Sequence, residues 1–327
     1  MKTKPILIIA GEPYSVFLEI FLKSFKKGLL KNLKSPVILI CSEKLLFKQM
    51  KKLNYNFKTN RVSENNISAI NSNKNINTIN VDFKFQKLFD KISKKSNNYI
   101  ENSCSLALKI MKKYNLKILI NGPISKKYFL RNKYPGMTEY FADKSRKKNQ
   151  EVMLIYGKKL AVSPLTTHYP LKKVSKMISK KKLIKHTMKI NEFYKSYLKR
   201  KPKIAITGLN PHCETNDKFS EEEKILIPAV KNLKVKKINI SGPYPADTIF
   251  MKKNYQKFDV IIGMYHDQVL APIKTIYEFK AINITIGLPF IRITPDHGPN
   301  HHMLGKNKSS PDSFIEILNF IKSISAN

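Results

Sequence analysis

The segment that decides the fold reads Val260-Ile261-Ile262-Gly263-Met264-Tyr265-His266-Asp267-Gln268. Its first residues are β-branched or small, and polar residues follow them at once, which is typical of a buried parallel strand. Open α/β sheets place their ligand crevices at the carboxyl ends of such strands. The segment therefore predicts a parallel sheet with chemistry at and around His266.

Similar runs recur along the chain and alternate with helical patterns. The further predicted strands are Ile6–Ala10, Val37–Cys41, Lys117–Ile120, Val152–Tyr156, Lys203–Thr207 and Ile282–Ile286, with another near Ala161. The predicted helices are Phe17–Lys27, Glu43–Leu53, Gln86–Tyr114 with a break, Leu183–Lys199, Ser220–Leu233 and Pro311–Ile324. This alternation predicts an α/β fold with a mostly parallel sheet. Residues 54–78 are rich in Asn, Ser and Lys with weak periodicity, so we interpret them as a surface excursion.

Length and composition limit the class of protein. The 327 residues are 42% hydrophobic, enough for a sizeable core in two domains or in one large domain with a cleft. The first apolar run, Pro5 to Ala10, is cut short by Gly11 and is too short for a signal peptide or a membrane span. The three cysteines have no CxxC spacing, so neither a disulfide framework nor a zinc knuckle is indicated. We expect a cytoplasmic protein without a membrane partner.

The formal net charge of +38 raises the question of a nucleic-acid partner. Only five of the 61 basic residues are Arg, although specific base reading favours the Arg fork. The lysines are scattered among abundant Asn and Ile rather than gathered in one segment. This distribution favours a solvated, lysine-coated enzyme surface over a polyanion-binding protein.

The candidate chemistry lies directly after predicted strands. No GxGxxG or Walker-type phosphate loop occurs, so an ordinary Rossmann or P-loop site is not indicated. His168 follows the strand near Ala161, His212 follows Lys203–Thr207, and His266 follows Val260–Gly263. Neutral imidazoles from separate strand ends can converge on one divalent cation. The residues alone leave open the alternative of three unrelated loop histidines bonded to backbone.

A set of motifs resembles one enzyme family over most of the chain from about residue 116 to 305. The motifs are Asn121–Lys126 (NGPISK), Thr138–Tyr140 (TEY), Thr166–His168 (TTH), Gly208–His212 (GLNPH), Pro245–Thr248 (PADT), Met264–Gln268 (MYHDQ), Asn283–Arg292 (NITIGLPFIR) and Asp296–Gly298 (DHG). In order and spacing they resemble the signature blocks of the 4-hydroxythreonine-4-phosphate dehydrogenase family.

The resemblance implies a fold of two α/β/α lobes with mostly parallel sheets flanking a central active-site cleft, as in isopropylmalate dehydrogenase. Residues 1–130 with 295–327 would form the first lobe, which carries the coenzyme loop. Residues 131–294 would form the second lobe, which carries metal and substrate residues and dimer contacts. The family also implies a homodimer whose active site is shared between subunits.

The resemblance further assigns roles to individual residues. The implied ligands of one divalent metal per subunit (Zn, Co, Mn or Mg) are His168, His212 and His266, with His266 contributed by the neighbouring subunit. The implied substrate-binding residues are Thr138, Lys274, Asn283 and Arg292, and the implied catalytic residues are Asp247, Asp267 and Lys274. The implied NAD(P)-binding residues are His297, Gly298 and His302.

The implied reaction is oxidation of 4-phosphohydroxy-L-threonine by NAD(P), followed by decarboxylation to 3-amino-2-oxopropyl phosphate, a step of pyridoxal 5′-phosphate biosynthesis. A cation beside the substrate hydroxyl lowers its pKa so that hydride can leave the same carbon. Lys274 and Arg292 can neutralise a phosphate or carboxylate.

The sequence departs from the family pattern in two loops. Gly11-Glu12-Pro13 continues as Tyr14-Ser15-Val16-Phe17 in place of a small, Gly-containing segment, which puts close backbone approach to a ligand in doubt. After His212, a Gly-rich stretch is replaced by the more acidic Cys213-Glu214-Thr215-Asn216-Asp217.

Two single positions also differ. Met137 stands where the family has a substrate-contacting His, and His302 stands where an Asp for the adenosine ribose is expected. These differences keep alternatives open: a dehydrogenase for another four-carbon acid phosphate, such as threonate or erythronate 4-phosphate, or a non-catalytic polyanion-binding descendant.

Overall fold

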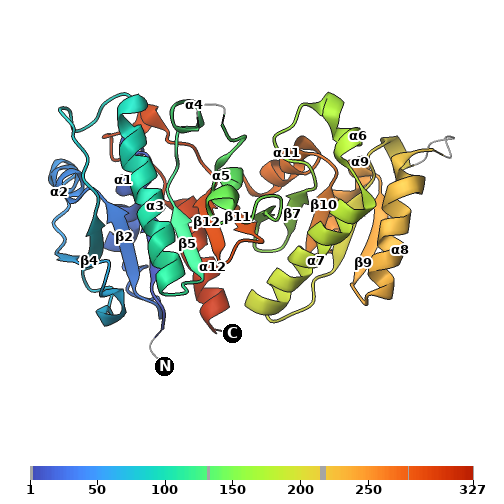
Figure 1. The fold of residues 1–327 in the computed structure, drawn as a ribbon, viewed down its shortest axis with the longest axis horizontal. Helices are drawn as coiled ribbons and strands as arrows, with labels where there is room; N and C mark the ends of the chain where they lie inside the picture. Colours follow the sequence, from blue (N-terminus) through green and yellow to red (C-terminus); the bar gives the residue numbers. More distant parts are fainter. Residues whose placement is uncertain (1–2, 131–132, 214–218, 279, 327) are drawn as a thin grey trace. The chain divides into compact units, whose positions relative to one another are not determined.

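A computed structural model describes residues 3–130, 133–213, 219–278 and 280–326 (Figure 1). The chain divides into two compact units. The first comprises Met1–Asn149 and Leu288–Ala326, and the second comprises Gln150–Gly287. The division thus falls after residues 149 and 287, whereas the sequence analysis places it after residues 130 and 294. Of the described residues, 133–149 and 288–294 fall in the first of these two units.

The first unit is built on a parallel sheet whose described strands run in the order β3-β4-β2-β1-β5-β12. The strands are β1 (Ile6–Ile9), β2 (Val37–Cys41), β3 (Thr59–Arg61), β4 (Ile76–Asn80), β5 (Ile118–Asn121) and β12 (Ile291–Pro295). β1, β2 and the last three residues of β5 are buried, which explains their near-continuous apolar runs.

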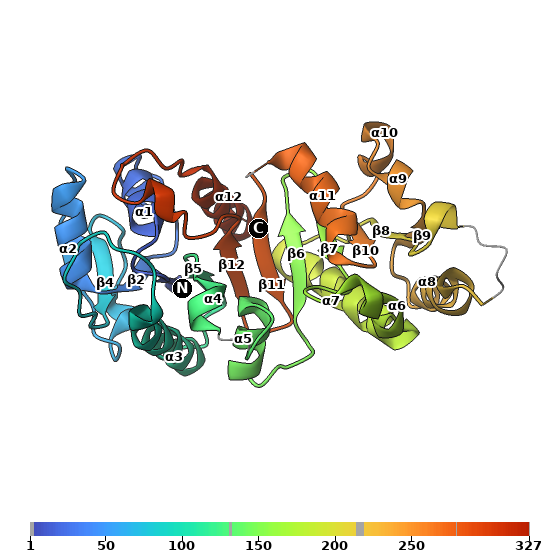
Figure 2. The same ribbon diagram turned by 90° about the horizontal axis from the view of Figure 1, so that it is seen from above.

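Helices cover both faces of this sheet (Figures 1 and 2). They are α1 (Phe17–Lys26), α2 (Glu43–Lys52), α3 (Asn97–Lys113), α4 (Lys126–Phe129), α5 (Met137–Lys144) and α12 (Asp312–Ala326). Figure 2 shows α1 and α12 on the face opposite α3. The α1–α12 contact is aromatic, because Phe314 packs edge-on against Phe17 with ring centroids 5.5 Å apart.

The second unit has a mixed sheet whose described strands run in the order β11-β6-β7-β10-β8-β9. The strands are β6 (Val152–Tyr156), β7 (Ala161–Pro164), β8 (Ile204–Thr207), β9 (Ile240–Tyr244), β10 (Val260–Gly263) and β11 (Ile282–Ile286). β7, β10, β8 and β9 are mutually parallel, whereas β6 pairs antiparallel with β7 and β11. The carboxyl ends of β7, β10 and β8 therefore meet at one edge of the sheet.

Helices also cover both faces of the second sheet. They are α6 (Val174–Met177), α7 (Lys180–Tyr197), α8 (Ile227–Val235), α9 (Ala246–Ile249), α10 (Lys252–Tyr255) and α11 (His266–Tyr277). Figure 2 shows α7 and α8 on the face opposite α11. Across the described ranges of both units, no helix is long and apolar enough to cross a membrane.

The predicted α/β class with mostly parallel sheets is confirmed, and every predicted strand is present to within one residue. Most of residues 54–78 lie at the surface, as predicted, but the stretch also contains β3 and the start of β4, which were not predicted. In β4 the polar Asn77 is buried, where it donates to the carbonyls of Val37 and Ser72.

Two helix boundaries also differ from prediction. The predicted helix Gln86–Tyr114 begins only at Asn97, after a short 3₁₀ turn at Lys94–Ser96. The predicted helix Ser220–Leu233 begins with a π-helical turn, Glu222–Leu226, before α8. Such π turns are frequent near functional sites.

A buried hydrogen bond fastens α7 to its sheet. Ser163 Oγ lies 2.7 Å from His186 Nε2 and donates to the carbonyl of Met153 at 2.5 Å. Because the hydroxyl has one proton, His186 Nε2–H must be the donor to Ser163. Burial, and then the charges of Lys182 and Lys189, lowers the pKa of His186 from 6.5 to about 3.

We expect acid to destabilise the protein through His186. Its folded-state pKa lies below its unfolded value, so the unfolded chain takes up the proton first as pH falls from about 6.5 toward 3. Going from about pH 7 to about pH 5 should cost about 2 kcal/mol of unfolding free energy. His186→Gln keeps an amide donor without titrating and should lose less stability over this range in urea melts. Identical pH dependence of the two proteins would contradict this assignment.

Candidate active site

The three predicted metal-binding histidines follow neighbouring parallel strands of the second unit. His168 follows β7, His266 follows β10 and begins α11, and His212 follows β8. The rings of His168 and His266 lie beside each other, with centroids 5.7 Å apart. The side chain of His212 is 74% exposed.

Carboxylates accompany two of these histidines. His266 Nδ1 lies 2.6 Å from Asp267 Oδ1, and His212 Nδ1 lies 3.9 Å from Asp247 Oδ2. A carboxylate that accepts from Nδ1–H fixes the tautomer in which Nε2 carries the lone pair, as in metal-binding His–carboxylate pairs. Both Asp residues named by the resemblance thus lie against a predicted ligand.

The donor chemistry fits a divalent ion, because neutral imidazoles with carboxylates nearby suit Zn²⁺, Co²⁺ or Mn²⁺. The His168 and His266 rings that lie side by side belong to one chain, whereas the resemblance implies a His266 ligand from the neighbouring subunit. Within the described part of the chain, however, no three His, Cys, Asp or Glu side chains form a group that could hold one ion. The structure thus brings two of the three predicted ligands together and does not gather the third with them.

The turn that carries His212 is held by a buried carboxylate. Glu222 Oε1 accepts from the backbone amides of Leu209 and Asn210 at 2.7 and 2.9 Å, and Oε2 accepts from Asn210 Nδ2 at 2.7 Å. Burial opposes ionisation of Glu222, but these donors outweigh it and lower its pKa. A Cβ on Gly208 would lie 3.0 Å from Glu222 Oε1 and closer still to Cys213 Sγ, so the turn requires glycine there.

His212 and Cys213 themselves adopt left-handed backbone conformations, with φ of 56° and 57°. Residues 214–217 of the acidic loop noted in the sequence lie outside the described residues.

Two predicted substrate residues also lie in the second unit. Lys274 is on α11, two turns beyond His266, and is partly buried. Asn283 is on β11, and its buried Oδ1 has no hydrogen-bond partner among the described residues. Buried acceptors are nearly always paired, so an unpaired one is consistent with a ligand position.

The other predicted substrate residues lie in the first unit. Arg292, on β12, is only 3% exposed, and its Nε donates to Asn121 Oδ1 at 2.6 Å while its guanidinium lies over the Phe141 ring. Burial lowers its pKa to about 10, so the side chain stays charged at neutral pH. Thr138 is buried in the first turn of α5, and the neighbouring Met137 packs into the apolar core of this unit.

The predicted coenzyme loop follows β12 and is tied to α1. The amide of Val16 donates to Pro299 O at 3.1 Å, and Lys23 Nζ donates to the carbonyl of Ser309 at 2.7 Å. His297 Nδ1 lies 2.8 Å from Gly298 O, which makes Nδ1 the donor and leaves Nε2 as an acceptor. His297 Nε2 is buried and has no partner among the described residues. His302 is exposed.

The backbone of Gly11 lies close to another part of the chain, residues 122 and 123. A Cβ on this residue, whose φ is +80°, would lie 2.6 Å from the carbonyl of Pro123. Gly11 therefore serves packing between the ends of β1 and β5.

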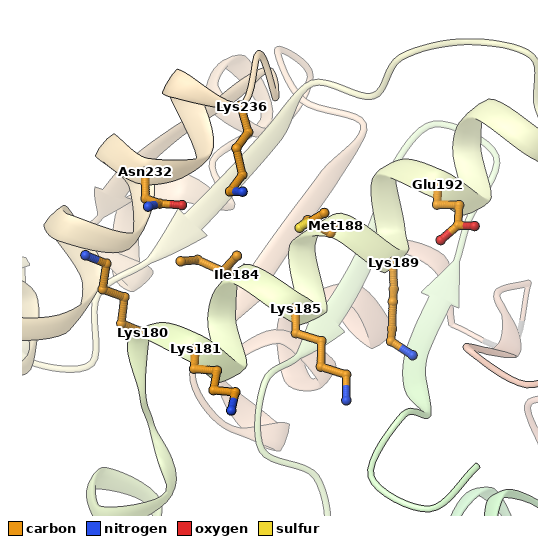
Figure 3. A pocket seen from close by; sticks show the side chains of 9 residues that line it. All are labelled: Lys180, Lys181, Ile184, Lys185, Met188, Lys189, Glu192, Asn232 and Lys236. Carbon is orange, nitrogen blue, oxygen red and sulfur yellow. The ribbon is translucent and has the colours of Figure 1, made fainter. Parts of the chain in front are cut away.

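A separate groove of about 760 Å³ lies over the outer face of α7 and the end of α8 (Figure 3). Ile184 and Met188 form its apolar part. Its remaining lining residues are Lys180, Lys181, Lys185, Lys189, Glu192, Asn232 and Lys236. Because lysines are abundant throughout this chain, their presence here identifies no ligand by itself.

Known proteins resemble the chain over nearly its whole length. It is 38% identical over 315 residues to 4-hydroxythreonine-4-phosphate dehydrogenase of Sulfurihydrogenibium sp., covering 95% of each chain. It is 30% identical to a putative D-threonate 4-phosphate dehydrogenase of Oceanobacillus iheyensis, covering 97% of each. Its structure matches that of a putative 4-hydroxythreonine-4-phosphate dehydrogenase from Salmonella typhimurium with a TM-score of 0.84 and 26% identity, covering 98% of this chain and 99% of the other.

Together with the polar strand ends, these likenesses define an enzyme of the dehydrogenase class. Residues 32–321 match the family described as Pyridoxal phosphate biosynthetic protein PdxA. The chain belongs to the PdxA family, as the sequence motifs predict.

Proposed function

We propose that the chain oxidises 4-phosphohydroxy-L-threonine with NAD(P) and releases carbon dioxide to give 3-amino-2-oxopropyl phosphate, in pyridoxal 5′-phosphate biosynthesis. The observation that carries this proposal is the placement of His168, His212 and His266 after three neighbouring parallel strands, in a chain of the PdxA family. A cytoplasmic homodimer is part of the proposal.

The proposed ligands of one divalent metal per subunit are His168, His212 and His266, with His266 supplied by the neighbouring subunit. Such an ion, when bound, stabilises negative charge on substrate oxygen during hydride departure and decarboxylation. Asp267 accepts from Nδ1–H of His266, which leaves the Nε2 lone pair of that ring for an ion. Asp247 lies 3.9 Å from His212 Nδ1, where its negative charge favours a cation at this histidine.

The remaining proposed contacts bind and orient the substrate. Arg292 supplies fixed positive charge for a phosphate or carboxylate, because Asn121 and Phe141 hold its guanidinium plane. Thr138 lies in the first turn of α5, and the positive end of a helix dipole favours an anion there. Asn283 offers its buried Oδ1 as an acceptor, and Lys274 supplies a second positive charge.

The proposed reaction accounts for each hydride, proton and carbon dioxide that is transferred. Hydride leaves C3 for the coenzyme, the hydroxyl proton passes to a base such as Asp267 or Asp247, and the resulting β-keto acid loses carbon dioxide before a proton returns to carbon.

A second candidate substrate is D-threonate 4-phosphate. Two observations favour it: the Oceanobacillus iheyensis relative carries that name, and Met137 replaces a polar family residue and packs into the core. Both substrates share the phosphate, the C3 hydroxyl and the carboxylate, and they differ at the group on C2.

A direct assay tests the proposed function. We expect reduction of NAD(P) with 4-phosphohydroxy-L-threonine at a kcat/KM at least about tenfold above that with D-threonate 4-phosphate, since a site built around one polar group rejects its analogue. Coenzyme reduction is followed by absorbance, and erythronate 4-phosphate serves as a stereochemical control. Preference for threonate would establish the second candidate. Inactivity with all three, together with salt-dependent retardation of RNA, would favour the polyanion-binding alternative.

Metal dependence is tested by removing the metal with a chelator and then adding a divalent metal back. We expect chelator-treated protein to lose activity and to regain it with Zn²⁺, Co²⁺, Mn²⁺ or Mg²⁺, and His212→Ala to lose both metal and turnover. Metal content by mass spectrometry and activity are measured on the same samples. Normal metal content in His212→Ala would remove His212 from the ligand set.

The choice of coenzyme is proposed to depend on His302. A carboxylate there would accept from the 2′- and 3′-hydroxyls of NAD and repel the 2′-phosphate of NADP. His302 exerts no such repulsion, and Lys306 and Lys308 are exposed nearby in sequence.

We therefore expect NADP to be used at least as well as NAD, and His302→Asp to shift the preference toward NAD. The ratio of kcat/KM for the two coenzymes is compared in both proteins. A strong NAD preference that the substitution leaves unchanged would show that this loop does not contact the ribose.

A further inference from the structure

One side chain joins the turns that carry His212 and His266. Gln268 Oε1 accepts from Thr207 Oγ1 and from the backbone amide of Met264, both at 2.7 Å. Gln268 Nε2 donates to the carbonyl of Gly208 at 2.8 Å. All these groups belong to the second unit, and each of the three hydrogen bonds joins Gln268 to the last residue of β8 or to the residue that follows β8 or β10.

The backbone leaves room for this bridge. A Cβ on Gly263, the last residue of β10, would lie 3.2 Å from Gln268 Oε1 and 2.4 Å from Val269 Cγ1. Only glycine at this position lets the first turn of α11 fold back so closely across the strand end. The side chain of Gln268 therefore reaches Met264 on its own turn and Thr207 on the neighbouring strand at once.

We infer that Gln268 is a positioning residue that holds the turn before His266 and the turn before His212 in fixed register. Thr207 and Gly208 immediately precede the Glu222-anchored turn of His212, and Met264 lies two residues before His266. The inference rests on the proposed role of both histidines as metal ligands. In the proposed homodimer His212 serves the site of its own subunit and His266 serves the site of the neighbouring subunit, so one Gln268 positions one ligand of each site.

The turn that carries His168 is also bonded to the end of β10, through contacts that do not involve Gln268. Thr166 Oγ1 donates to the carbonyl of Met264 at 2.7 Å, and the Leu165 amide donates to Gly263 O at 2.7 Å. The carbonyl of Met264 thus accepts from Thr166, two residues before His168, and the amide of Met264 donates to Gln268. Loss of Gln268 should release the His212 turn while the His168–His266 connection persists.

The test uses full-length protein freed of metal, with Gln268→Met, which keeps the length of the side chain and removes all three hydrogen bonds. Co²⁺ is titrated and its visible d–d absorption is recorded. We expect Gln268→Met to bind Co²⁺ about tenfold or more weakly with an altered spectrum, since groups that orient metal ligands have effects of this size. Gln268→Glu keeps both acceptor contacts and should bind with intermediate affinity.

A matched control comes from the first unit. Gln49 is buried and donates from Nε2 to Leu88 O, so Gln49→Met also removes a buried glutamine contact. It should lower thermal stability without changing Co²⁺ affinity or the spectrum. Wild-type affinity and spectrum in Gln268→Met would overturn the inference.

Hydrogen–deuterium exchange of the metal-free proteins tests whether Gln268 joins the two turns, independently of whether the protein binds a metal. In Gln268→Met, exchange should accelerate both at Leu209 and Asn210 and at Met264–Gln268. Acceleration confined to Met264–Gln268 would show that Gln268 does not hold the His212 turn. Absence of Co²⁺ binding by the wild type would overturn the proposed metal function, and the exchange result would still decide whether Gln268 joins the two turns.

Discussion

The parallel pairing of β7, β10 and β8 is the constraint on which the candidate site depends. Parallel strands that are adjacent in a sheet end at the same edge, so the residues that follow them are neighbours although they are far apart in sequence. The pairing explains why His168 and His266 lie with their rings side by side. It also brings Thr207 within reach of Gln268, and hence two turns within reach of one side chain.

The positive charge of the chain is of two physical kinds. Surface lysines are solvated and screened, so they contribute little selectivity for any one anion. Arg292 is buried beside Asn121 and Phe141, where an anion would meet its charge at lower dielectric and in fixed orientation. In the proposed site, recognition of a small acid phosphate therefore depends on this one guanidinium far more than on the net charge of +38.

Strands whose residues are all apolar were predictable from sequence, and Val260–Gly263 is an example. Among the strands that were not predicted, β4 and β12 each contain a buried polar residue, Asn77 and Arg292, whose hydrogen-bond partner lies elsewhere in the chain. A pattern of alternating polarity cannot distinguish such a residue from an exposed one, since the partner is remote in sequence. Glu222 was missed for the same reason: its contacts with the His212 turn arise only once the π-helical turn forms.

The first unit is discontinuous in sequence, and this has a consequence for how the protein is made. Residues 150–287, the whole second unit, leave the ribosome before β12 and α12 do. Until then β5 lacks one parallel neighbour, and the Phe17 face of α1 lacks the Phe314 ring that covers it. The nascent chain therefore carries an open sheet edge and an uncovered aromatic surface while its second unit is being synthesised, and exposed surface of this kind is what a chaperone protects.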